Sequence, residues 1–116
     1  MKDNLLIITR LKKTVTYLDK LLENFNRNEN VLRDNIKKTM YQLLEDSYSA
    51  NIYNKEEKIN YQKQMLVHIK MLDFYIQLSY NKKMISSKQY TMIGNHLLDI
   101  YVLVQAWIKS VNNETS

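Results

Sequence analysis

Residues 85–111 read ISSKQYTMIGNHLLDIYVLVQAWIKSV, and this stretch decides the fold of the chain. Ser86 and Gln89 have the spacing of a capping box at a helix N-terminus, and Ile85 with Tyr90 has that of a hydrophobic staple. From Tyr90 onward, apolar side chains recur at alternating steps of three and four residues, which is typical of a helix with one buried face. We therefore predict a helix over residues 87–111 whose core face is formed by Tyr90, Ile93, Leu97, Ile100, Val104, Trp107 and Val111.

Three more helices are predicted when the same periodicity is followed toward the N-terminus. They cover residues 3–24, 29–50 and 55–80, and residues 112–116 form a polar tail. The asparagine-rich segment after the first helix predicts a tight turn, with Asn28 as the N-cap of the second helix. Asn54 and Glu57 have capping-box spacing at the start of the third helix.

Four long helices joined by short connections predict an all-α fold. We expect residues 1–116 to form a single domain, an antiparallel up-down-up-down four-helix bundle. The chain contains one glycine, no proline and no cysteine. This composition excludes glycine-rich phosphate loops, disulfide frameworks and thiolate zinc sites.

No constellation of catalytic or metal-binding residues is evident. His68 and His96 fall on different predicted helices, and neither has a ligand-type residue suitably spaced on its own helix face. Adjacent carboxylates such as Glu45 and Asp46 point to different sides of a helix and cannot share a site. We expect both histidines to be structural, and we expect no enzyme activity, no metal and no cofactor.

The chain is basic, with a formal net charge of +5. Such a charge favours nucleic acid, an anionic membrane or an acidic protein as partner. The outer face of the first helix carries basic residues without an acidic one, which indicates contacts with phosphates. The alternative is a solvated face whose lysines reflect the composition of an AT-rich genome. The candidate nucleic-acid-binding residues are Arg10, Lys13, Tyr17, Lys20 and Arg27, extended by Arg33 and Lys37.

Neither a targeting segment nor a membrane span is predicted. The apolar run of residues 5–8 is too short for a signal peptide. A span takes about 20 apolar residues, and the richest stretch is interrupted by Asp99 and Gln105. We expect a cytoplasmic protein without membrane contact.

The third predicted helix is apolar nearly all round, and a single bundle core cannot cover both of its sides. Monomers rarely expose large apolar patches, so this pattern favours self-association. The alternative is that wide tyrosine and methionine faces cover a thick core within one chain. The candidate interface residues are Val67, Met71, Phe74, Tyr75 and Leu78 on this helix and Tyr101 on the next.

Residues 82–110 resemble the C-terminal part of a family of small four-helix-bundle proteins. The family includes the accessory variability determinant (Avd) of diversity-generating retroelements and proteins encoded in intervening sequences of 23S rRNA genes. The matching elements are the capped start at residues 85–90, the core residues Leu98-Asp99-Ile100 and the closing Trp107-Ile108-Lys109-Ser110. The rest of the chain is similar more loosely.

Two local differences refine the resemblance. Tyr48-Ser49-Ala50-Asn51 stands where the rRNA-intervening proteins usually carry a glycine-containing acidic motif, which favours the Avd-like subset. Gln105-Ala106 replaces a glycine pair that the family often has before the tryptophan, which puts any close helix contact made by that pair in doubt.

The resemblance implies a non-enzymatic basic homopentamer. Such a protein binds RNA or DNA together with the reverse transcriptase of its element, and it assists mutagenic cDNA synthesis from template-repeat RNA. The residues themselves leave an alternative open, namely a structural oligomer or protein-interaction adaptor of the rRNA-intervening-sequence type, with no specific role on nucleic acid.

Overall fold

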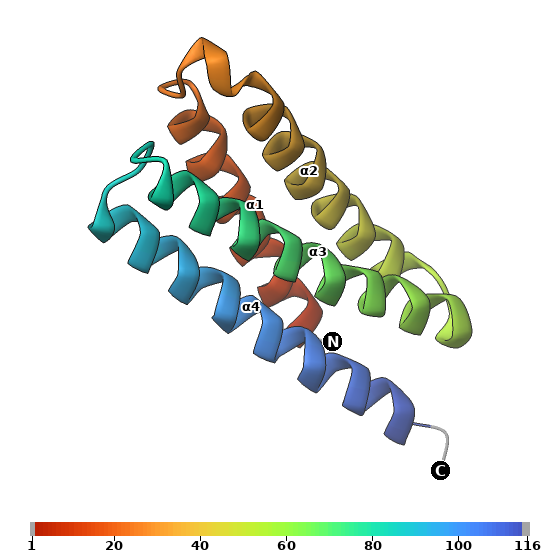
Figure 1. The fold of residues 1–116 in the computed structure, drawn as a ribbon. Coiled ribbons are helices and arrows are strands. Elements are labelled where there is room, and N and C mark those ends of the chain that lie inside the picture. The colour runs from red at the N-terminus through yellow and green to blue at the C-terminus, as the bar shows by residue number, and fades with distance from the viewer. Residues whose placement is uncertain (1, 115–116) are drawn as a thin grey trace.

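Four long helices lie side by side in the computed structural model, which describes residues 2–114 and the side chains of residues 5–114 (Figure 1). The helices are α1 (Lys2–Leu22), α2 (Asn30–Ile52), α3 (Lys55–Asn81) and α4 (Ser87–Asn113), with a short 3₁₀ turn, η1 (Arg27–Glu29), before α2. The described residues form no β-strand, so the prediction of an all-α fold with four helices is confirmed. None of these helices has the length and apolar content to cross a membrane.

The helices surround one core in the order α1, α2, α3, α4. Each helix packs against the preceding and the following one, and α4 also packs against α1, so α1 lies diagonal to α3 and α2 lies diagonal to α4. All four contribute nearly fully buried side chains, such as Leu11, Met40, Leu72 and Leu97. A chain of this size buries roughly two thirds of the surface that its unfolded form exposes. Here the buried side chains of all four helices form one core.

The start of α4 follows the sequence prediction closely. The Gln89 backbone N–H donates to Ser86 Oγ at 3.1 Å, and the Ser86 N–H donates to Gln89 Oε1 at 2.9 Å. The capping box is thereby confirmed, since both reciprocal bonds are present. The predicted core face of α4 is buried as well, apart from Tyr90, which is half-buried and stacks on Tyr80 with ring centres 4.6 Å apart.

The caps of α2 and α3 differ from the prediction. Glu29, not Asn28, is the N-cap of α2, because Asn28 lies inside η1. Asn54 is the N-cap of α3, but its side chain makes no capping hydrogen bond, so the box predicted with Glu57 does not form. Neither of these two helices therefore begins with a side-chain cap from its N-cap residue.

Two of the connections meet at the same end of the bundle. Lys82 Nζ lies 3.3 Å from Glu29 Oε2, joining the start of α2 to the end of α3. Asn26 Nδ2 also donates to Met84 Sδ at 3.9 Å. Lys83, between these contacts, has a left-handed backbone with φ of 63°.

Candidate nucleic-acid interface

The outer face of α1 presents basic side chains to solvent. Its core register is set by Leu11, Val15 and Leu18, which places Lys13 and Lys20 on the opposite side of the helix. Arg10, Lys13 and Lys20 are exposed, as is Arg27 in η1. None of these four side chains forms an ion pair with a residue in the described part of the chain. Their charges are therefore available to an external anion.

A groove of about 400 Å³ runs between α1 and α4 beside this face. Arg10, Lys13 and Tyr17 line it from α1, and Met92, His96 and Asp99 are among the residues lining it from α4. Tyr17 is half-buried and packs against the core, so only part of its ring faces outward. The structure thus brings three of the predicted residues together and adds His96, which the sequence interpretation had treated as structural.

Arg33 and Lys37 occupy a different place. Both lie on α2, both are half-buried, and neither lines the groove between α1 and α4. Arg33 Nε lies 3.6 Å from Asp34 Oδ1 on the next residue of the same helix. Part of the Arg33 charge is therefore already compensated within the chain, unlike the charges of Lys13 and Lys20.

A buried carboxylate–imidazole pair between α2 and α3 was missed by the sequence interpretation. His68 Nδ1 lies 2.7 Å from Asp46 Oδ2, and Asp46 is only 1% exposed. Gln42 Nε2 donates to the second oxygen, Asp46 Oδ1, at 3.1 Å. Because the two partners stand 22 residues apart on different helices, their pairing depends on the relative register of α2 and α3.

This contact holds the imidazole ring in place and gives the buried Asp46 carboxylate a second polar partner beside Gln42. A metal site would need more ligands than His68 supplies. The part of the chain that the structure describes contains no group of three or more histidine, aspartate or glutamate residues placed to hold a metal ion.

The apolar residues predicted as a subunit interface fall into two groups. Val67, Met71 and Phe74 are exposed on α3, and Val67 retains 61% of its accessible surface. Tyr75, Leu78 and Tyr101 are half-buried and pack against the core of their own chain. The structure adds Leu98 and Val102 on α4, both more than half exposed. The five exposed residues are called the α3–α4 apolar face below: Met71, Phe74, Leu98, Val102 and Val67, the last of which also borders a groove between α2 and α3.

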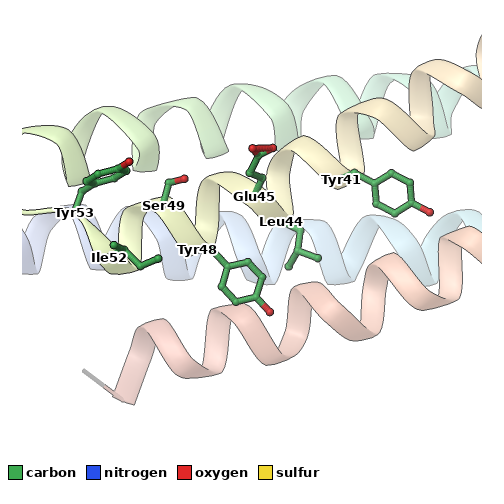
Figure 2. Close-up of a pocket in the computed structure, with 7 residues that line it drawn as sticks. All are labelled: Tyr41, Leu44, Glu45, Tyr48, Ser49, Ile52 and Tyr53. Carbon is green, nitrogen blue, oxygen red and sulfur yellow. The ribbon is translucent and has the colours of Figure 1, made fainter.

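A second apolar surface, on α2, also escaped the sequence interpretation. It is a groove of about 390 Å³, called the α2 groove below, and Figure 2 shows the residues that line it: Tyr41, Leu44, Glu45, Tyr48, Ser49, Ile52 and Tyr53. The signal was present in the sequence, because Tyr41, Tyr48 and Ile52 are seven and four residues apart and so share one helix face.

Two tyrosines of the α2 groove are held by neighbouring helices. Tyr41 Oη donates to Asp19 Oδ1 of α1 at 2.8 Å, and this hydrogen bond raises the pKa of the Tyr41 hydroxyl above its ordinary value of 10.0. At the other end, the Tyr53 ring stacks on Tyr61 of α3 with centres 5.4 Å apart. The groove therefore has an ordered aromatic lining.

Comparison with known proteins adds a fold match. A protein of unknown function from the S23 ribosomal protein family of Bacteroides thetaiotaomicron superimposes with a TM-score of 0.85. The alignment covers 94% of this chain and 99% of that protein, at 19% sequence identity. The chain shares the fold of this S23-family protein. No protein-family model and no curated protein matches the sequence.

Proposed function

We propose that this protein is a basic, nucleic-acid-binding accessory subunit of a diversity-generating retroelement. In this proposal it partners the reverse transcriptase and the template RNA of the element during mutagenic cDNA synthesis, and it is not itself an enzyme. Residues 1–116 form one domain with an antiparallel up-down-up-down path, and five copies assemble into a ring. The four-helix fold shared with the S23-family protein supports the Avd-like resemblance at the level of fold.

The observation that carries the proposal is the outer face of α1. Arg10, Lys13 and Lys20 are exposed there and make no ion pair with a described residue, and Arg27 continues the face beyond the helix. Side chains of this kind contact phosphates without reading base sequence. In a ring of five copies they would form a belt of about twenty positive charges, which would bind RNA and DNA strongly at low salt.

The test is a double charge reversal, Lys13→Glu with Lys20→Glu. Both side chains point away from the core, so folding and assembly should be retained. Affinity for a 20-nucleotide RNA should fall at low salt. Each lost phosphate contact lowers the slope of log affinity against log salt by about 0.7 to 0.9, so the loss of two contacts should lower the slope by about 1.4 to 1.8.

A matched control carries the same change in net charge elsewhere. Lys88 and Lys109 are both exposed on α4 and do not line the groove with α1. The pair Lys88→Glu and Lys109→Glu should leave the salt slope nearly unchanged. Equal losses in both double variants would show that binding follows net charge alone, and the assignment to α1 would fail.

A second candidate function, a structural oligomer or protein adaptor, draws support from the α3–α4 apolar face. It predicts stable assembly with no salt-dependent affinity for RNA or DNA. Fluorescence anisotropy with labelled RNA separates the two functions. The salt concentration is raised from about 50 to about 200 mM, because phosphate-mediated binding weakens steeply over this range.

A further inference from the structure

The molecule carries two unlike apolar surfaces that point in different directions. One is the α2 groove, and the other is the α3–α4 apolar face. The α2 groove is lined by residues 41–53, whereas the α3–α4 apolar face lies on α3 and α4, so the two surfaces share no residue. One copy can therefore present each surface to a different neighbour.

Both surfaces are too apolar to be ordinary solvent-facing patches. Ile52 in the α2 groove retains 75% of its accessible surface, and Leu98 on the other face retains 60%. Tyr41 and Tyr53 in the groove are already held by Asp19 and Tyr61, so little side-chain entropy would be lost when a partner covers them. Ordered tyrosines are the kind of anchor on which protein interfaces depend.

The charges on the two surfaces are complementary. Among the described residues that line the α2 groove, Glu45 is the one with a charged side chain. The α3–α4 apolar face is flanked by Lys63 and Lys70, the latter over the Tyr101 ring at 4.6 Å, and by Asp73. The α2 groove is thus acidic, and the flank of the α3–α4 apolar face, with two lysines and one aspartate, is net positive.

Pairing of each surface with itself is unfavourable by comparison. A two-fold contact places the same patch on both sides, so Glu45 would meet Glu45 of the other copy within an apolar surface. On the α3–α4 apolar face, Lys63 and Lys70 outnumber Asp73, so a two-fold contact would bring together two patches of net positive charge. Like charges facing each other in an interface oppose association, whereas unlike patches avoid this cost.

We propose that the α2 groove of one copy receives the α3–α4 apolar face of the next copy, so that the chains associate head to tail. The inference rests on the self-association included in the proposed function and assigns its second surface. A head-to-tail contact that closes on itself produces a ring, and one that does not close produces a filament.

The test is a complementation experiment between two assembly-deficient variants. The first carries Tyr48→Glu and Ile52→Glu in the α2 groove, and the second carries Val67→Glu and Phe74→Glu on the other face. Each variant alone should be monomeric by native mass spectrometry. An equimolar mixture should give a heterodimer, because the first variant still offers an intact α3–α4 apolar face to the intact α2 groove of the second.

The control is Val31→Glu, which adds a charge at an exposed apolar position of α2 outside the groove. This variant should assemble like the parent. Persistent assembly of either double variant, or a mixture that remains monomeric while both variants are helical by circular dichroism, would overturn the head-to-tail pairing. A monomeric parent protein would instead remove the self-association on which the pairing rests.

A charge swap keeps the proposal testable if the double variants do not fold. Glu45→Lys and Lys70→Glu should each weaken assembly by tenfold or more. The two substitutions together in one chain should restore it, because the charges that face each other across the contact are then exchanged and again opposite in sign. Absence of restoration would refute the pairing. RNA binding by the cations of α1 is measured separately, so its failure leaves this result unaffected.

Discussion

Among residues 2–114, Lys83 is the one non-glycine residue whose backbone has a positive φ. Its φ of 63° lies in the left-handed region, which costs a side-chain-bearing residue roughly 1 kcal/mol. The reason is the end of α3: the Met84 N–H donates to Ser79 O at 2.8 Å and the Lys83 N–H donates to Tyr80 O at 2.9 Å. These two bonds form a Schellman motif, whose left-handed position is usually glycine.

Lys83→Gly should therefore stabilise the protein. The substitution removes the strain of the left-handed backbone, but the larger conformational freedom of glycine in the unfolded chain offsets part of this gain. The free energy of unfolding should therefore rise by about 0.5 kcal/mol. Urea unfolding followed by circular dichroism measures the change, with Lys83→Ala as a control that keeps the strain. Equal effects of the two substitutions would show that the lysine side chain, and not the backbone, matters here.

The Asp46–His68 pair gives a second prediction at this scale. His68→Ala leaves a carboxylate that is 1% exposed with Gln42 as its remaining partner, so the free energy of unfolding should fall by about 3 kcal/mol. His96→Ala is the matched control, because His96 is exposed and should cost less than about 0.5 kcal/mol. Similar losses in both variants would mean that the pair adds nothing beyond side-chain packing.

At the scale of the helices, the N-terminal caps show that the spacing of a capping box in the sequence does not ensure that its hydrogen bonds form. Ser86 and Gln89 form the predicted box, whereas Asn54 and Glu57 have the same spacing and do not. Ser86→Ala should lower the free energy of unfolding by about 1 kcal/mol, since two backbone donors lose their partners or their orientation. Asn54→Ala is the control and should be nearly neutral. A loss at Asn54 equal to that at Ser86 would show that its side chain caps α3 in solution.

Most of the helical pattern was predictable because periodicity is a local property. The core face of α4 and the position of each helix follow from spacing alone. The Asp46–His68 contact and the α2 groove did not follow, because they depend on how α2 is rotated against its neighbours. Tyr41 illustrates the point: its place beside Asp19 is set by the packing of α1 on α2, and neither residue's local sequence specifies it.

At the scale of the whole molecule, the proposed self-association predicts that stability depends on protein concentration. Folded chains that assemble are stabilised by mass action, so the melting temperature should rise with protein concentration. For a pentamer, each tenfold increase in protein concentration contributes about 1 kcal/mol per chain, which corresponds to a rise in melting temperature of roughly 4 °C for a domain of this size. Differential scanning calorimetry between 5 and 500 μM covers about two such steps.

The matched variant for this prediction is Phe74→Glu. Phe74 is exposed on the α3–α4 apolar face, so a charge there should leave the isolated bundle intact and act only where a neighbouring copy would bury it. Its melting temperature should be independent of concentration and should equal that of the parent protein extrapolated to high dilution. A parent melting temperature that does not change with concentration, together with an unchanged Phe74→Glu variant, would mean that the apolar faces of α3 and α4 remain open to solvent in a monomer.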